Sequence, residues 1–328
     1  MLTMRRTSLI AIASLLAPAV GACIPGPNFD PAEIIKTPRI LAIVADYPDA
    51  PPGQDVRLRA LVVDPPGERA LDLEWTVCAS AESIGGGPGI SGAQYGMQVR
   101  SVGCEAGQPG VIPLAREGDV GVLPGALTML AFSELDRLAA VFGSDLPPEL
   151  LQRLADDVGL PLTVEVTVRA GVGGEVLVRG YKRVLIRNGA PHGTNPPEPR
   201  VRIGDRWFTT DTAVGAAPFE CVPEDGGAPE VTATHGTVVS LHPDPDDARW
   251  FEQYTVLDPQ GGLLVHMESA YYSWFATAGH FAADVTQSPT RDNEWTAPAE
   301  LGPQSLWVVV RDGHGGNTAC RVHATIDE

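Results

Sequence analysis

The sequence predicts a mainly β protein with two β-sandwich domains, the first of which carries an α-helical hairpin insertion. Residues 162–186 and 306–326 each place the pattern V-R-x-G-x-G-G between two β-rich runs, which is typical of a hairpin with a glycine turn. The chain also contains 36 Gly and 30 Pro in 328 residues. This composition favours short strands and many turns over long helices.

Residues 1–22 are predicted to form an export signal. A short basic region precedes an apolar run over 9–20 that is too short to cross a bilayer as a permanent helix. The run ends at V-G-A-C, and these residues resemble the signal of bacterial lipoproteins. The resemblance implies that Cys23 is lipidated and anchors the mature chain to a membrane. The same resemblance implies that, in a Gram-negative cell, the anchor lies in the outer membrane, on its periplasmic face or the cell surface, because Ile24 is not the aspartate that marks inner-membrane retention in that family. An ordinary signal beside an incidental cysteine is the alternative.

The formal net charge of −18 bears on the class of partner. Nucleic acid is not an expected partner, because a polyanion would be repelled rather than attracted by released counterions. The acidity is interpreted as a solubility feature. The expected partners are the membrane, through the lipidated N-terminus, and an unidentified envelope protein or glycan.

Four cysteines remain besides the lipidated one, and an exported protein is expected to pair them in two disulfides. Three connectivities are possible. We predict sequential pairing, Cys78 with Cys104 and Cys221 with Cys320, because each bridge then stays within one domain. A zinc site is not expected, because no C-x-x-C pattern accompanies these residues.

The first domain is expected over residues 37–188, after a Pro-rich tether over 23–36. Its first strands are expected over 39–45, 56–63 and 71–77. The third strand alternates, and its apolar residues should share one buried face. These residues are Leu71, Leu73, Trp75 and Val77.

An insertion is expected at about 79–160 within this domain. It begins with a glycine-rich loop over 85–89, which lacks the residues of a phosphate-binding loop. Two apolar stripes at helical spacing predict an αα-hairpin that covers an edge or end of the sandwich, with a partner-binding groove as the alternative. The stripes are Leu135, Leu138 and Phe142, then Leu151, Leu154 and Val158.

Residues 189–199 are predicted to be a linker, and 200–328 the second domain. A strand is expected over 237–241, and a long loop over 211–230 held by Cys221. Cys320 alternates in phase with Val322, Ala324 and Ile326, which places its sulfur inward.

An internal repeat connects the two domains. A D-P-x-G turn at 64–67, and another at 258–261, each precede a strand with a tryptophan, Trp75 and Trp274. With the two hairpins, these residues resemble immunoglobulin-like sandwiches of bacterial surface proteins, including those of the polycystic-kidney-disease type. Cys78 departs from that pattern, because it points to the face opposite Trp75 and cannot form the usual bridge between sheets.

No catalytic motif occurs in the sequence, so we expect neither an enzyme nor a cofactor. The seven histidines are scattered, and His192 and His314 lie in a linker and a turn where solvent exposure is expected. A hydrolase without a recognisable motif stays an alternative. It would need histidine and carboxylate side chains to converge in a pocket between the second domain and the helical insertion.

Calcium is the metal that the sequence suggests most. Asp244, Asp246 and Asp247 offer several oxygens in a short turn, although the spacing is not that of an EF-hand. The expectation is a solvated acidic turn and no metal, with these three residues as the calcium candidates.

Aromatic residues cluster in the second domain. Tyr272 and Trp274 share one face of a strand and should be core. A carbohydrate-binding module would instead need Trp250 or Tyr271 exposed beside a shallow groove. Taken together, the sequence predicts a membrane-anchored envelope lipoprotein with a non-catalytic role in adhesion, scaffolding or binding. A carbohydrate-binding accessory module is the alternative. Ligand identity, oligomeric state and membrane leaflet are not encoded in a recognisable way.

Overall fold

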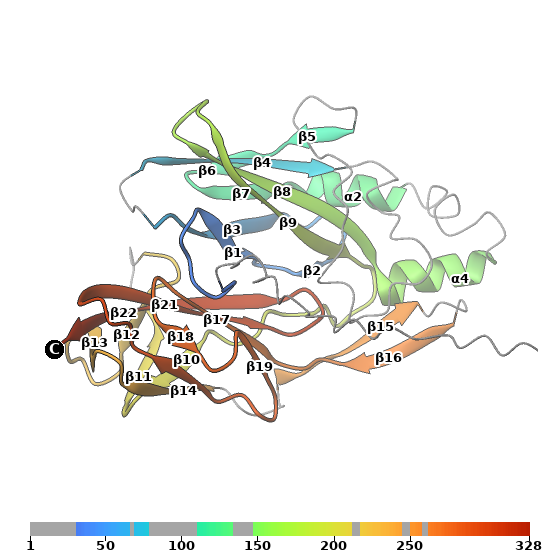
Figure 1. Cartoon of the computed structure of the whole chain (residues 1–328). Helices are drawn as coiled ribbons and strands as arrows, with labels where there is room; N and C mark the ends of the chain where they lie inside the picture. Colours follow the sequence, from blue (N-terminus) through green and yellow to red (C-terminus); the bar gives the residue numbers. More distant parts are fainter. Residues whose placement is uncertain are drawn as a thin grey trace, which may run out of the picture. The chain divides into compact units, whose positions relative to one another are not determined.

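A computed structural model describes residues 31–65, 69–78, 110–133, 147–211, 217–244, 250–257 and 262–328. Residues 32–328 form one compact unit, in which strands predominate (Figure 1). The predicted class, mainly β with two immunoglobulin-like sandwiches, is confirmed. No described helix is both long and apolar enough to cross a membrane.

The first sandwich consists of two sheets built from residues 39–186. Its five-stranded sheet has the order β2 (Asp49–Ala50), β9 (Val176–Ile186), β8 (Leu160–Ala170), β4 (Leu71–Cys78), β5 (Val111–Pro113). Its four-stranded sheet has the order β1 (Arg39–Ala45), β3 (Val56–Val63), β7 (Val120–Leu123), β6 (Ala115–Glu117).

The second sandwich is built from residues 200–327. Its five-stranded sheet has the order β13 (Glu230–Thr234), β22 (Asn317–Asp327), β21 (Gly302–Arg311), β17 (Tyr271–Ala276), β19 (Val285–Gln287). Its six-stranded sheet has the order β12 (Cys221–Pro223), β11 (Arg206–Thr210), β10 (Arg200–Ile203), β14 (Val238–Asp244), β20 (Asn293–Thr296), β18 (His280–Phe281). A separate hairpin joins β15 (Gln253–Leu257) to β16 (Leu263–Met267).

The two V-R-x-G-x-G-G hairpins form as predicted, β8 with β9 and β21 with β22. Both turns need positive φ, which Gly173 adopts at 67° and Gly313 at 82° without steric cost. The repeat extends further than the sequence indicated. In each five-stranded sheet the hairpin is flanked by the tryptophan strand on one side and by a short parallel strand on the other, β2 or β13.

The strand correspondence between the two domains is nevertheless incomplete. Residues 254–257 precede the second D-P-x-G turn as β3 precedes the first, yet β15 pairs with β16 outside both sandwiches. Residues 66–67 and 258–261 of the D-P-x-G turns lie outside the described residues. The tryptophan strands and hairpins therefore correspond, whereas the strands that precede them do not.

Each sandwich has its own core, and the predicted alternation is confirmed in both. Leu73, Trp75 and Val77 are buried in the first core, with Leu71 packed against it. Cys320 lies in the second core with Val322, Ala324 and Ile326. The predicted disulfide between Cys221 and Cys320 forms there and fastens β12 to β22. A disulfide is typical of an exported protein.

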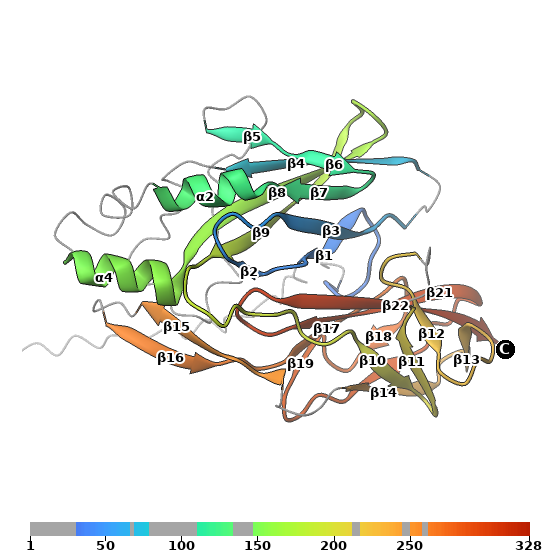
Figure 2. The ribbon, with the colours of Figure 1, turned by 180° about the vertical axis from the view of Figure 1, so that it is seen from behind.

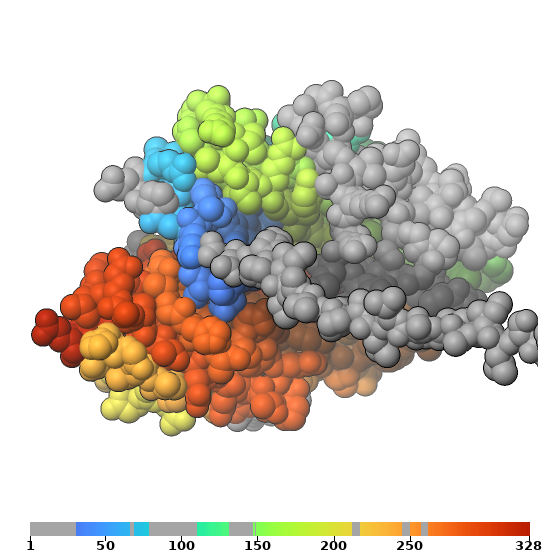
Figure 3. Space-filling model, viewed as in Figure 1, coloured from blue at the N-terminus to red at the C-terminus, as the bar shows by residue number. Residues whose placement is uncertain are grey.

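A third apolar cluster joins the two sandwiches. Leu41 on β1 and Leu61 on β3 pack with Trp307 and Val309, which come from β21 of the second sandwich. Figure 3 shows the first described residues, in blue, between the light green strands of one sandwich and the orange strands of the other. Strand β1 and the end of β3 are therefore buried on both faces, because their alternate residues fill the first core, whereas Arg57 and Arg59 on the earlier part of β3 are exposed.

The insertion is only partly helical. Helix α2 (Gly125–Ser133) contacts β8 and β9, and helix α4 (Pro148–Arg153) continues into a π-helical turn, η2 (Leu154–Val158), which lies beside β15 (Figure 2). The second predicted stripe is thus helical, whereas the first lies in residues 134–146, outside the described residues. Residues 111–123 add strands β5, β6 and β7 to the sandwich, which the helical pattern did not predict.

Candidate functional site

The segment predicted to be a linker, 189–199, is bonded to both sandwiches. The Asn195 amide nitrogen donates to the carbonyl of Ala45 at the end of β1, over 2.6 Å. Its amide oxygen accepts from the backbone N–H of Asn317 at the start of β22, over 3.0 Å. One side chain therefore connects the two sandwiches, and the segment is an ordered part of their junction.

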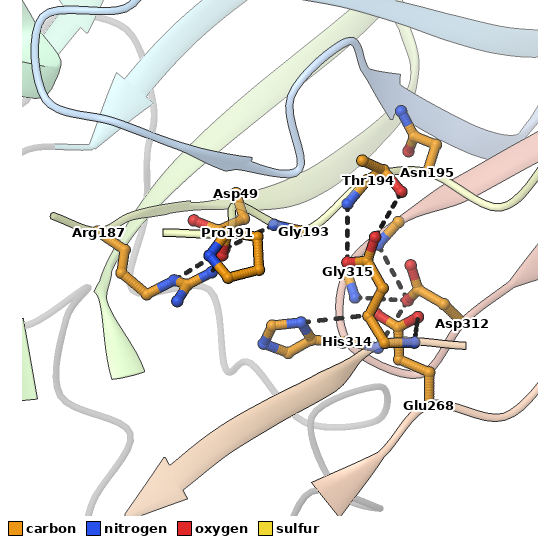
Figure 4. A network of polar contacts seen from close by, with 12 residues as sticks. Asp49, Arg187, Pro191, Gly193, Thr194, Asn195, Glu268, Asp312, His314 and Gly315 are labelled. Carbon is orange, nitrogen blue, oxygen red and sulfur yellow. Dashed lines mark hydrogen bonds and ion pairs between the residues drawn. The ribbon is translucent and has the colours of Figure 1, made fainter. Parts of the chain in front are cut away.

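Asp49 on β2 organises the same segment from the first sandwich (Figure 4). Its side chain is 1% exposed and accepts from Arg187 Nε over 2.8 Å and from the backbone N–H of Gly193 over 2.9 Å. His192 Nδ1 lies 3.3 Å from the other carboxylate oxygen. The predicted solvent exposure of His192 is wrong, because this contact holds the ring half-buried.

Asp312 fixes the turn between β21 and β22. One carboxylate oxygen accepts the backbone N–H groups of His314, Gly315 and Gly316 over 2.6, 2.9 and 3.0 Å. Burial raises the pKa of Asp312 to about 6, although these three hydrogen bonds oppose the shift. The D-G-H-G-G sequence therefore forms a turn built around its own first carboxylate.

Lys182 on β9 reaches this turn from the first sandwich. Its ammonium group donates to the carbonyl of Gly315. Burial lowers the pKa of Lys182 to about 8, and the negative charge of Asp312 opposes that shift. This is a second polar connection between the sandwiches.

Glu268 lies beside His314 of the same turn. Burial, with the nearby charge of Asp312, raises the pKa of Glu268 to about 8, and its carboxylate accepts the Glu252 N–H over 3.0 Å. His314 Nδ1 is 3.8 Å from Glu268, and the ring stacks on Tyr254 with centroids 4.0 Å apart. Burial lowers the pKa of His314 to about 4. The predicted solvent exposure of His314 is therefore wrong.

A carboxyl group with a raised pKa beside a histidine with a lowered pKa is a pairing that acid–base catalysis uses. A histidine and a carboxylate side chain, which a hydrolase would need close together, are thus in contact next to β15 and η2. However, Glu268 is only 4% exposed, and the residues of this polar network line neither of the two cavities described next. Among the described residues, no group of three or more His, Cys, Asp or Glu could hold a metal ion.

A cleft of about 900 Å³ opens between the two sandwiches. One wall comes from the first sandwich and includes Val62 on β3 and Leu71 on β4. The other comes from the second sandwich and includes Phe219 and, on β22, Ala319. A smaller cavity of about 330 Å³ lies between β10, β13 and β14. Ligand sites commonly occupy cavities of roughly 300–1,000 Å³ at junctions of this kind.

Phe219 has an unusual backbone in this cleft. Its φ is 67°, the only positive value at a non-glycine position among the described residues. This conformation costs about 1–2 kcal/mol in a bulky residue and persists only where the surroundings enforce it. Here the Phe219 carbonyl accepts from the Arg321 N–H over 2.6 Å, and Cys221 follows two residues later in its disulfide. The ring packs against the cluster that joins the sandwiches.

Charged residues of both signs also line the cleft. They are Arg59, Arg69, Asp119, Glu198 and Asp211. Two arginines against three acids leave a formal charge of −1, and Arg69 is already bonded to Asp64 over 2.7 Å. Glu198 accepts from the hydroxyl of Thr210 over 3.3 Å. The cleft is therefore weakly acidic, and apolar residues line it as well.

Several sequence-predicted site residues lie outside the described residues. Cys23 and Cys104 are among them, so the lipidation and the Cys78–Cys104 disulfide remain predictions. Of the calcium candidates, Asp246 and Asp247 also lie there. Asp244 is bonded to Arg200 over 3.0 Å, on β14.

The aromatic residues are distributed as strand packing predicts. Tyr272 and Trp274 are buried in the second core. Trp250 and Tyr271 are half-buried, and Trp250 packs against Phe251 with ring centroids 4.4 Å apart. The carbohydrate platform that required one of these two rings exposed is therefore not formed.

Sequence reasoning did not find the polar network or the cleft. The D-G-H-G-G turn carried a usable signal, because an aspartate before closely spaced glycines often accepts backbone N–H groups. No sequence pattern marks Phe219 or Arg59 as site residues, because their placement depends on contacts between sandwiches that are distant in sequence.

No family model and no curated protein matches this chain. Among solved structures, it is similar to three N-terminal domains of the bacteriophage RB49 outer capsid protein Hoc, with 12% identity and a TM-score of 0.19, over 88% of this chain and 59% of that one. It is also similar to the Ig1-2 module of the Drosophila receptor tyrosine phosphatase DLAR (10% identity, TM-score 0.20, 89% and 100% covered). A third similar structure is Bacteroides ovatus SGBP-B in complex with a mixed-linkage heptasaccharide, with 9% identity and a TM-score of 0.21, over 89% of this chain and 71% of that one. At these TM-scores the likeness carries no information about ligand or activity.

Proposed function

We propose that this chain is a membrane-anchored envelope lipoprotein whose two sandwiches act as one rigid, non-catalytic binding or scaffolding unit. The observation that carries the proposal is the junction between the sandwiches. An apolar cluster, the Asn195 bridge and the Lys182 contact all cross it. Such a junction holds the cleft walls at a fixed separation, which reduces the entropy lost when a ligand binds.

The non-catalytic part of the proposal rests on the burial of the ionisable groups. Asp49, Asp312 and Glu268 are each less than 5% exposed, and each accepts hydrogen bonds from the protein itself. Buried polar groups that are satisfied in this way rigidify a structure. We assign them a structural role, in which Asp49 fastens the linker to the first sandwich, Asp312 holds the β21–β22 turn together, and Glu268 holds the backbone of Glu252.

The anchor is proposed from the signal sequence and is tested separately. Metabolic labelling with a radioactive fatty acid should mark the wild-type chain but not the Cys23→Ala variant. Density-gradient fractionation should place the wild type with outer-membrane vesicles. Equal labelling of both chains, or recovery of the wild type in the soluble fraction, would contradict the anchor.

The binding role is tested by crosslinking in cells, followed by mass spectrometry of the captured material. The full chain should repeatedly capture the same envelope component, through crosslinks to residues around the cleft. A Cys23→Ala chain, released from the membrane, is the matched control and should capture less of it. Capture of no reproducible component would contradict a binding or scaffolding role.

A further inference from the structure

The cleft between the sandwiches differs from the junction beside it. At the junction, Leu61 and Trp307 close the space with apolar side chains. At the cleft, the walls separate and leave about 900 Å³ between β3 and β4 on one side and Phe219 and β22 on the other. Among the described residues, one part of the interface between the sandwiches is therefore an open cleft and another part is closely packed.

Phe219 gives the cleft an aromatic wall at a cost in backbone strain. Strained positions cluster at ligand sites, because function can retain a conformation that stability alone would remove. The Phe219 side chain both packs on the joining cluster and lines the cleft. The aliphatic groups of Val62 and Leu71 extend this apolar surface.

The polar residues of the cleft determine which polar groups a ligand should carry. Asp119 and Glu198 supply carboxylate acceptors, and Arg59 supplies a guanidinium donor. All three are exposed to solvent, and together they carry a negative charge. An anionic ligand would be repelled, and a purely apolar ligand would leave these charges without partners when it displaced their water. A neutral ligand that is rich in hydroxyl groups and apolar on its flat faces would suit both the charged groups and the apolar surface.

We propose that this cleft binds a neutral oligosaccharide, which stacks a ring face on Phe219 and bonds its hydroxyl groups to Arg59, Asp119 and Glu198. The proposal rests on the proposed binding function and specifies its ligand class. The site is distinct from β17, whose Tyr272 and Trp274 are buried in the second core. A cell-surface polysaccharide and the glycan of a glycoprotein offer the same chemistry.

The test uses the full mature chain, labelled with a fluorophore, on an array with three arms. One arm carries neutral hexasaccharides of gluco-, manno- and xylo- type, the second carries neutral glycoprotein glycans, and the third carries oligogalacturonates. Titration calorimetry with the strongest neutral binder then gives its affinity for the wild type and the variants. Binding to the first or second arm identifies the source of the sugar.

Two kinds of variant separate loss of the site from loss of the fold. Phe219→Gly removes the ring but suits the positive φ, and Asp119→Asn changes an exposed carboxylate without changing its size. Each should weaken binding at least tenfold. Tyr47→Ala removes an aromatic side chain that is 43% exposed and does not line the cleft, so its affinity should equal that of the wild type.

Binding of a neutral glycan that both cleft variants weaken supports the proposal. Binding to oligogalacturonate alone, binding to no glycan, or neutral binding that Asp119→Asn and Phe219→Gly leave unchanged would overturn it. Capture of an envelope protein in cells together with an empty array would leave the proposed function standing while this inference fails.

Discussion

Glu268 allows the electrostatics of the junction to be tested in isolation. Folding raises the pKa of Glu268 from an ordinary 4.5 to about 8. Between pH 4.5 and 8, the folded chain therefore keeps a proton on Glu268 that the unfolded chain has lost. Stability therefore falls as pH rises through this window. His314 titrates between about 4 and 6.5 and has the opposite sign, and Lys182 acts above about 8. Among the groups with shifted pKa values, Glu268 therefore makes the largest contribution to the pH dependence of stability from pH 6.5 to 8.

The size of the effect follows from proton linkage. One proton of difference changes the free energy of unfolding by about 1.4 kcal/mol per pH unit. Over the 1.5 pH units of this window, the wild type should lose up to about 2 kcal/mol. Glu268→Gln keeps an oxygen to accept the Glu252 N–H but cannot ionise. Its free energy of unfolding should be nearly constant between pH 6.5 and 8, and higher than that of the wild type at pH 8.

Guanidinium denaturation at pH 6.5, 7.2 and 8.0, followed by tryptophan fluorescence, measures these free energies. Glu300→Gln changes an exposed carboxylate and serves as the control, which should keep the wild-type slope. A wild-type stability that is flat or rises across the window would refute the reasoning. So would a Glu268→Gln variant that retains the wild-type slope.

Three further variants examine the junction and the disulfide. Asn195→Ala should lower the free energy of unfolding by about 1–3 kcal/mol, because it leaves two backbone groups without partners. A loss below about 0.5 kcal/mol in denaturant titrations would show that the Asn195 bridge does not stabilise the junction. The wild type should gain stability between pH 8 and 10.5, where the folded Lys182 has lost its proton and the unfolded lysine has not, and Lys182→Met should abolish this gain. If the gain persists in the variant in the same titrations, Lys182 is not its source. The double variant Cys221→Ser, Cys320→Ala opens a loop of 99 residues and should lose about 4–5 kcal/mol, visible as a lower melting temperature; an unchanged melting temperature would show that the bridge constrains little.

Local patterns predicted the strands and the hairpins well. The alternation from Leu71 to Val77 and from Cys320 to Ile326 reports which face is buried, because successive side chains in a strand point to opposite faces. The V-R-x-G-x-G-G turns were found because glycine is needed where φ is positive. Both signals are carried by residues adjacent in sequence.

The junction could not be predicted in the same way. β1 and β3 have apolar residues on both faces, a pattern that the sequence contains but that does not say what covers the second face. Lys182 and Gly315 are 133 residues apart, and no local rule connects them. The helical pattern likewise gave no hint that β7 pairs with β3.

The candidate site depended almost wholly on such distant contacts. His314 was expected in solvent because glycine turns are usually exposed, whereas this turn is covered by Tyr254 and by the linker. Phe219 has no sequence feature that marks a positive φ. Its conformation follows from the Arg321 contact and the nearby disulfide, which the sequence could suggest only in part.

The burial of β1 and the end of β3 on both faces also bears on whether the two sandwiches could be separated. The two five-stranded sheets share one strand order, as two copies of one module would. Here an excised second sandwich would present Trp307 and Val309 to water, where they invite aggregation. The two halves have therefore become mutually dependent, and they are expected to be inherited, exported and degraded together.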